Sequence, residues 1–107
     1  MSREDDPRLD IRGMVFEWYP PKARSNLKKH KVSFQEASTI FGDKKMLELP
    51  DREHSEEELR SIGVGRSDRD RLLFVNFTVH DDGVRIISAR QAEPWERREY
   101  EIANRHE

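Results

Sequence analysis

Two apolar segments joined by a tight turn constrain the fold of this chain more than any other feature. The first is RLLFVNFTVH at residues 71–80, and the second is VRIISARQA at residues 84–92. Asp82-Gly83 between them is a strong signal for a two-residue β-hairpin. The first segment is apolar at both odd and even positions. This pattern predicts a central strand that is covered on both faces, or covered on one face and functional on the other.

The first half of the chain predicts a strand followed by two helices. Residues 12–18 alternate three apolar side chains on one side of a half-buried strand, namely Met14, Phe16 and Trp18. Pro21 suits the first turn of a helix that we expect to run to about Lys29. Three of its residues recur at i, i+4 and i+7 and are expected to face the core, namely Ala23, Leu27 and His30.

The second helix has clear start and stop signals. Ser33 and Glu36 have the spacing of a capping box, in which each residue caps a backbone N–H of the other. The apolar face of this helix is expected to consist of Ala37, Ile40 and Phe41. Gly42-Asp43 ends it.

The whole pattern predicts an α+β domain with the order β-α-α-β-β-β-β-α. The first two of the four strands after the helices correspond to MLELP and to LRSIGVG, and Gly63 and Gly65 interrupt the second. The last helix begins at Pro94. This helix is expected to bury Trp95, Ile102 and Ala103 on one side. Helices that precede a run of strands favour a mainly antiparallel sheet with helices on one face. We expect residues 1–11 to be a loosely attached polar lead-in and residues 12–105 to form the single domain.

Composition excludes several classes of function. The 107 residues include no cysteine, so disulfides, thiolate metal sites and cysteine nucleophiles are excluded. No apolar run has the roughly 18 residues of a membrane span, and the charged start is unlike a signal peptide. These features predict a cytoplasmic protein. Although 39% of the residues are charged, the net charge is only −2. Contacts with nucleic acid would therefore depend on local patches.

Charge is distributed unevenly along the chain. No acid occurs between Glu17 and Glu36, and this gap holds Lys22, Arg24, Lys28, Lys29 and Lys31. Residues 51–58, DREHSEEE, hold five acids against one arginine. A basic block followed by an acidic block indicates two surfaces that face different partners.

The reactive residues leave phosphate chemistry as the open possibility. The four histidines show no i, i+4 pair of a helical zinc site, and no G-x-S-x-G or P-loop motif is present. Cleavage of RNA at a 2′-hydroxyl needs a proton acceptor, cations beside the phosphate and a proton donor, but no metal. Residue types alone do not separate such a site from a well-solvated charged surface.

Strand parity identifies Arg90 as the best candidate for a phosphate ligand. By simple alternation, Ile87 and Ala89 share one face of the last strand, and Ile86, Ser88 and Arg90 share the other. Arg85 and Arg90 are then on opposite faces unless a bulge intervenes. With the helices on the Ile87 face, Arg90 projects from the open face, where its replacement would barely affect folding. Arg97 and Arg98 are expected to stay solvated.

Five stretches of the chain carry a resemblance to a known family, and they are FEWYPPKARSNLKKH (16–30), VSFQEA (32–37), LPDREHSEEELR (49–60), RIISARQA (85–92) and ERREY (96–100). Together they resemble the BrnT family, the ribonuclease toxins of BrnT/BrnA type II toxin–antitoxin systems. The resemblance covers roughly residues 14–101. It implies a fold like that of RelE-type toxins and metal-independent RNA cleavage without a cofactor. It also implies a BrnA-type antitoxin with a ribbon-helix-helix segment, through which the complex binds operator DNA.

The resemblance implies a catalytic group of residues, which comprises His54, Glu58, Arg60, Arg85 and Arg90. The basic stretch supplies a second group, expected to bind RNA or the antitoxin, which comprises Lys22, Arg24, Lys28 and Lys29. No metal ligand is implied. Where the family commonly has KHG, this chain has His30-Lys31. Lys31 must then take a left-handed conformation, at a cost of about 1 kcal/mol, or the chain must leave the helix differently.

Most of these residues also have a purely structural interpretation, and the chain also has non-catalytic interpretations. In these alternatives His54 caps a turn, Glu58 is one of several solvated glutamates, and Tyr100 packs against the sheet without taking part in the chemistry. For the whole chain, the alternative is a catalytically inactive toxin-like module that acts only as an antitoxin-binding co-repressor. A third possibility is a scaffold domain without a role in nucleic-acid biology.

Overall fold

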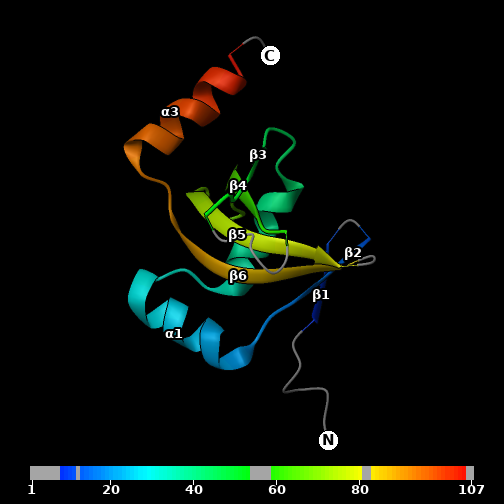
Figure 1. Cartoon of the computed structure of the whole chain (residues 1–107). Coiled ribbons are helices and arrows are strands. Elements are labelled where there is room, and N and C mark those ends of the chain that lie inside the picture. Colours follow the sequence, from blue (N-terminus) through cyan, green and yellow to red (C-terminus); the bar gives the residue numbers. More distant parts are fainter. Residues whose placement is uncertain (1–7, 12, 54–58, 81–82, 106–107) are drawn as a thin grey trace, which may run out of the picture.

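A single sheet of six strands is the centre of the fold in this computed structural model, which describes residues 8–11, 13–53, 59–80 and 83–105 (Figure 1). The strands are β1 (Arg8–Ile11), β2 (Met14–Glu17), β3 (Leu47–Pro50), β4 (Ser61–Arg66), β5 (Leu72–His80) and β6 (Gly83–Gln91). The helices are α1 (Pro20–His30), α2 (Phe34–Ser38) with the 3₁₀ turn η2 (Thr39–Gly42), and α3 (Pro94–Ala103).

The sheet is mixed, with the spatial order β1-β2-β6-β5-β4-β3. β2 runs parallel to β6, and every other neighbouring pair is antiparallel. The predicted α+β class and the hairpin of β5 and β6 are confirmed. The predicted order of elements lacks β1, which forms within the expected lead-in and pairs with β2. The likeness to RelE-type toxins stays a prediction.

A β-bulge divides β6 and corrects the parity argument. Asn76 pairs with Ser88 and Phe77 pairs with Ile86, so Ile87 has no partner on β5. One extra residue on one strand reverses the alternation beyond it. Ile86 and Ala89 therefore share the core, contrary to simple counting. Arg85, Ser88 and Arg90 lie together on the opposite face of the sheet.

The larger core lies between the sheet and the first two helices. Its buried residues come from β2, α2, β5 and β6, and include Phe16, Phe34, Val75, Phe77 and Ile86. β4 contributes glycines on this face. A Cβ on Gly65 would lie 3.0 Å from Ile40 Cβ and 3.1 Å from Met46 Cγ. The absence of a side chain thus lets η2 pack directly on the strand.

An asparagine, and not the predicted leucine, docks α1 on the sheet. Asn26 is 5% exposed, whereas Leu27 is 48% exposed. Because β2 pairs with β6 only at residues 83–85, the backbone of Ala89 lacks a strand neighbour on that side. The Asn26 side chain takes that place: Nδ2 donates to Ala89 O at 2.8 Å, and Ala89 N donates to Oδ1 at 3.1 Å. Nδ2 also donates to Val32 O at 3.0 Å.

The capping box of α2 forms only in part. Ser33 Oγ accepts the Glu36 backbone N–H at 3.0 Å, as predicted. The Glu36 carboxylate instead accepts Ser67 Oγ at 2.7 Å and Arg71 Nε at 3.0 Å. The bonds from Arg71 lower the pKa of Glu36 below its ordinary 4.5. Glu36 thus ties α2 to the turn between β4 and β5.

Lys31 ends α1 in the left-handed region, with φ 62° and ψ 30°, so the first of the two predicted exits is confirmed. Its backbone N–H donates to Leu27 O at 2.9 Å, which closes the last turn of the helix. The left-handed conformation is sterically unfavourable for a residue with a Cβ, whereas glycine adopts it freely. The departure from the family pattern therefore leaves the fold unchanged.

α3 lies on the face of the sheet opposite α1 and α2, so the prediction of helices on one face is wrong for this helix (Figure 1). Its anchor is Tyr100, which is 7% exposed and packs in a second cluster with Val64 and Leu72. The predicted apolar side is also wrong, because Trp95 and Ile102 are 52% and 44% exposed. None of the described helices is long and apolar enough to cross a membrane.

Candidate functional site

The face of β5 and β6 that α1 and α2 leave uncovered carries three consecutive cross-strand pairs. They are Phe74 with Arg90, Asn76 with Ser88, and Thr78 with Arg85. From Phe74 to Thr78 the strand rises about 13 Å. Arg85 and Arg90 therefore start from separate points along this face, from which they can contact different phosphates of one RNA strand. We call this surface the arginine face.

A chain of hydrogen bonds crosses the middle of the arginine face. Ser88 Oγ donates to Asn76 Oδ1 at 3.1 Å, and Asn76 Nδ2 donates to Asp51 Oδ2 at 2.6 Å. Asp51 follows the edge strand β3 and is 5% exposed. Neither Asp51 nor Asn76 is among the site residues predicted from the sequence. The signal for Asn76 was present, because it is an amide at the centre of an otherwise apolar strand.

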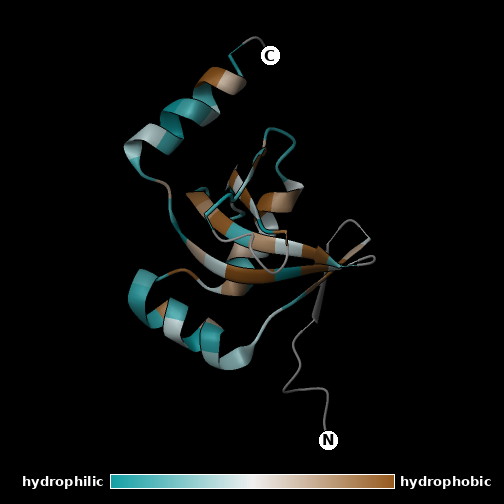
Figure 2. Cartoon of the chain, viewed as in Figure 1, coloured by the Kyte–Doolittle hydropathy of each residue, from teal (hydrophilic) through white to brown (hydrophobic). Residues whose placement is uncertain are grey.

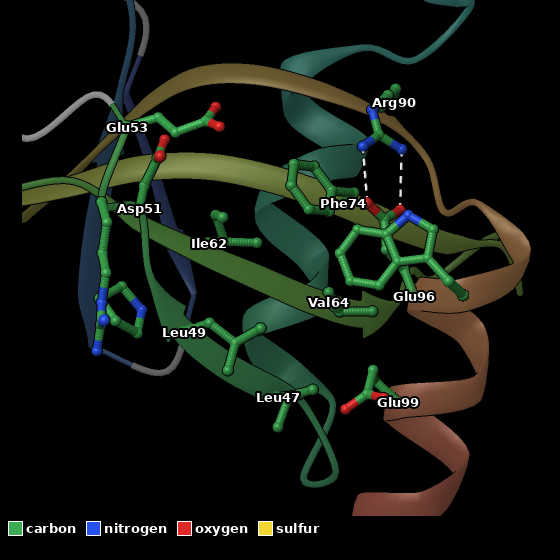
Figure 3. Close-up of a pocket in the computed structure, with 13 residues that line it drawn as sticks. Leu47, Leu49, Asp51, Glu53, Ile62, Val64, Phe74, Arg90, Glu96 and Glu99 are labelled. Atoms are coloured by element: carbon green, nitrogen blue, oxygen red, sulfur yellow. Dashed lines mark hydrogen bonds and ion pairs between the residues drawn. The ribbon is translucent and has the colours of Figure 1, made fainter.

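Arg90 is fixed by the first turn of α3. Its Nη1 donates to Glu96 Oε1 at 2.9 Å and its Nη2 donates to Glu96 Oε2 at 2.7 Å (Figure 3). The guanidinium also stacks on the ring of Phe74, 4.1 Å from the ring centre. The Glu96 side chain is 1% exposed and that of Arg90 is 30% exposed. The hydrogen bonds from Arg90 to Glu96 raise the pKa of the Arg90 guanidinium above its ordinary value.

This ion pair overturns the expectation that replacing Arg90 would barely affect folding. Removal of the guanidinium leaves a buried carboxylate without its counter-charge, which is costly. One edge of the guanidinium is nevertheless still available. Nη1 donates to Glu96 and to Gln91 O, and Nη2 donates one N–H to Glu96. A second edge, Nε–H with the other Nη2–H, makes no hydrogen bond to a described residue. That edge matches two phosphate oxygens.

Arg85 and Arg60 occupy the same face as Arg90. The Arg85 side chain is 43% exposed, and Glu17 lies 3.9 Å away, at the limit of an ion pair. Arg60 directly precedes β4 and has the parity of Ile62 and Val64, and its backbone oxygen accepts the Asp51 N–H at 2.9 Å. Three of the predicted catalytic residues are therefore brought to one face. His54 and Glu58 lie outside the described residues.

Tyr100 is a structural residue in this arrangement. Its hydroxyl donates to Asp43 Oδ2 at 2.8 Å. Burial, and then the bond to Asp43, raise the pKa of Tyr100 above its ordinary 10.0. The hydroxyl thus holds α3 to Asp43, directly after η2.

A groove of about 430 Å³ opens beside Arg90, between β3 and the start of α3 (Figure 3). Its floor is apolar and comes from the open faces of β3, β4 and β5, namely Leu47, Leu49, Ile62, Val64 and Phe74. Its walls include Asp51 and Glu53 on one side and Trp95, Glu96 and Glu99 on the other. This volume is within the range of small-molecule sites.

The predicted basic residues of α1 lie away from the arginine face. Lys22, Arg24, Lys28 and Lys29 are all exposed, and α1 is hydrophilic along most of its length (Figure 2). At 100° per residue they form two stripes, one with Lys22 and Lys29 and one with Arg24 and Lys28. α1 covers the opposite face of the sheet, so these residues and the arginine face belong to different surfaces. Arg97 and Arg98 are exposed, as expected.

In the described ranges, no group of three His, Asp or Glu side chains is arranged to hold a metal ion. His80 Nε2 lies 2.8 Å from Thr78 Oγ1, on the arginine face. His54 and Glu58 lie in the stretch 54–58, outside the described residues.

Comparison with known proteins identifies the family. A family model described as the ribonuclease toxin, BrnT, of type II toxin–antitoxin systems matches residues 18–96. The 1.1 Å crystal structure of the Brucella abortus ribonuclease toxin BrnT superposes with a TM-score of 0.56 at 20% identity, covering 71% of this chain and 92% of that chain. No curated protein matches the chain. The structural likeness shows a shared fold, and the family match spans most of the domain. The chain belongs to the BrnT family of ribonuclease toxins of type II toxin–antitoxin systems.

Proposed function

We propose that this toxin is a metal-independent endoribonuclease that binds the RNA backbone on its arginine face. The observation that carries the proposal is the bulge at Ile87, because it turns Arg85 and Arg90 to the same side of the sheet. Arg60, which directly precedes β4, has the parity of Ile62 and Val64 on the same face. Cations that share one face of a sheet can line an RNA backbone, and the Arg fork matches two phosphate oxygens.

The proposed reaction uses the substrate's own nucleophile. The 2′-hydroxyl attacks the neighbouring phosphate, the arginines stabilise the charge that develops on the phosphate oxygens, and the 5′-oxygen leaves with a proton. His54 and Glu58 are proposed as proton carriers from the family resemblance. Arg90 is proposed to contact phosphate through its second edge while Glu96 holds its position.

The test is cleavage of RNA by the purified toxin in excess chelator. We expect cleavage to continue, and the products to carry the 2′,3′-cyclic phosphate or 3′-phosphate ends that attack by the 2′-hydroxyl leaves. Activity that appears only after a divalent ion is added would refute metal independence. Binding of the antitoxin without any cleavage of RNA would favour the inactive co-repressor instead.

We also propose that the antitoxin covers α1. The proposed partner is a BrnA-type protein with a ribbon-helix-helix segment, which would carry operator DNA binding for the complex in the cytoplasm. No acid interrupts the chain from Trp18 to Gln35, so an acidic antitoxin segment would meet uniform positive charge. An antitoxin bound to α1 would lie on the side of the sheet opposite the arginine face.

Charge reversal on α1 should weaken the complex. We expect Lys28→Glu combined with Lys29→Glu to raise the Kd for the antitoxin about tenfold or more and to reduce its salt dependence, because two attractive charges are lost. Titration calorimetry at two ionic strengths measures both effects. Lys44→Glu combined with Lys45→Glu is the matched control, since both lysines are exposed outside α1. Equal affinity of both double variants and the unmodified toxin would exclude α1 as the docking surface.

A further inference from the structure

The groove beside Arg90 contains a large aromatic surface that the fold itself does not use. Trp95 is 52% exposed, although it lies in the first turn of α3 directly beside the buried Glu96. Its indole Nε1 donates to Glu93 Oε1 at 3.1 Å. This bond orients the ring, which lines the groove. A tryptophan in this position leaves a large apolar ring in contact with water and adds nothing to the core.

The groove combines the features that recognise a flat heteroaromatic ring. Its floor is apolar, one wall is an indole, and its polar wall groups are mainly carboxylates, among them Glu53 and Glu99 (Figure 3). A phosphate would be repelled by these acids. A planar ring with hydrogen-bond donors at its edge would be attracted, because it can stack on the indole and donate to the carboxylates.

We propose that this groove binds a nucleobase of the RNA substrate, an inference that rests on the proposed ribonuclease function. Arg90 connects the two surfaces, since it lines the groove and also ends the row of arginines on the sheet. A nucleotide whose phosphate contacts the second edge of Arg90 would have its base beside Trp95. The groove would thus select which bond of the RNA reaches the arginine face.

The chemistry of the walls favours guanine. An ionised carboxylate can only accept hydrogen bonds. Guanine presents two adjacent donors, the ring N1–H and the exocyclic amino group, which one carboxylate can accept together. Uracil, adenine and cytosine present a single donor group beside an acceptor at this edge. Arg52, which also lines the groove, supplies a donor for the guanine O6. Glu99 is the proposed carboxylate, because it is exposed and on the same helix as Trp95.

Binding of uncleavable RNA tests the groove separately from catalysis. The probe is a short 2′-O-methyl RNA with one central guanine, which lacks the hydroxyl nucleophile. Trp18 is 5% exposed, so quenching of the exposed tryptophan reports on Trp95. We expect the probe to quench the fluorescence, and inosine in place of guanine to bind about tenfold more weakly, because inosine lacks the amino group.

Variants separate stacking from base recognition. We expect Trp95→Ala to weaken binding of the guanine probe about tenfold or more, and Trp95→Phe to restore most of it, since a stacked base contributes roughly 1–3 kcal/mol. Glu99→Gln should reduce the preference for guanine over inosine to less than threefold. Glu101→Gln is the matched control, because Glu101 is exposed on the same helix but does not line the groove.

Three outcomes would overturn the proposal. One is binding of the probe without quenching, and the second is an unchanged guanine preference in Glu99→Gln. The third is a Trp95→Ala toxin that binds the probe normally but loses its antitoxin, which would make the groove a protein-docking site. Each of these results is distinct from a failure of the ribonuclease proposal, because that failure appears as absence of RNA cleavage in chelator.

Discussion

Arg90→Ala is expected to lower the free energy of unfolding by about 3 kcal/mol. This is the lower end of the range for breaking a buried ion pair, because the Arg90 side chain is 30% exposed while that of Glu96 is 1% exposed. The variant leaves the Glu96 carboxylate buried with the Glu93 N–H as its remaining donor at 2.8 Å. It also removes the contact with Phe74. Urea unfolding at neutral pH measures the change.

A double variant separates the missing charge from the missing side chain. Arg90→Met with Glu96→Gln removes both charges, keeps an acceptor for the Glu93 N–H, and places an apolar chain on Phe74. We expect it to recover at least half of the stability lost in Arg90→Ala. Arg97→Ala, a change at an exposed arginine of the same helix, should unfold like the unmodified toxin. A wild-type stability of Arg90→Ala would show that the pair with Glu96 contributes nothing to folding.

Asn26→Leu is expected to destabilise the domain by roughly 3 kcal/mol. Leucine fills nearly the same volume but leaves three buried backbone groups without the bonds that Asn26 supplies, at about 1 kcal/mol or more for each. These groups are the N–H and carbonyl of Ala89 and the carbonyl of Val32. Denaturant unfolding measures the loss, and hydrogen exchange at the Ala89 amide shows whether the bond was local to that site.

Asn26→Asp is the matched control for hydrogen bonding. The carboxylate can accept the Ala89 N–H but faces two carbonyl oxygens to which it cannot donate. Burial and these oxygens would raise the pKa of the new carboxyl in the folded state. Its penalty is then largest at neutral pH and shrinks as the pH falls below the folded pKa and the group is protonated. Equal stability of Asn26→Leu and the unmodified toxin would contradict the role of Asn26 as a substitute for a neighbouring strand.

Local signals predicted the elements whose geometry is set by nearby residues. Asp82-Gly83 predicted the hairpin, and Ser33 predicted the start of α2. The absence of glycine after His30 left two possible exits from α1, and the left-handed Lys31 is one of them. Each of these depends on backbone conformation within a few residues. The α+β class followed from the order of these elements.

The errors have a common cause, which is that long-range contacts decided the outcome. Counting by twos cannot locate the bulge at Ile87, because the bulge depends on how β6 pairs with β5. Hydropathy favours Leu27 over Asn26, since the partner that satisfies Asn26 is Ala89, 63 residues away. Glu96 is buried because Arg90 neutralises it. A glutamate in the first turn of a helix is predicted to be solvated unless its buried partner is known.

The candidate site was predicted in its components but not in its arrangement. The family resemblance identified Arg60, Arg85 and Arg90, and the structure brings them to one face. The polar bridge of Asp51, Asn76 and Ser88 was missed, because Asp51 reaches the sheet from the loop after β3. Their role in the chemistry stays a prediction.

The rate of RNA cleavage in chelator by the Arg90→Met, Glu96→Gln toxin tests most directly whether the arginine face carries the reaction. This variant is expected to stay folded, so a lost rate reports on chemistry and not on unfolding. We predict a fall in kcat of about a hundredfold or more, the scale for losing one charge-stabilising group, while Arg97→Ala keeps the full rate. A double variant that is folded and cleaves RNA at the unmodified rate would contradict the account, and would leave Arg90 with a purely structural role.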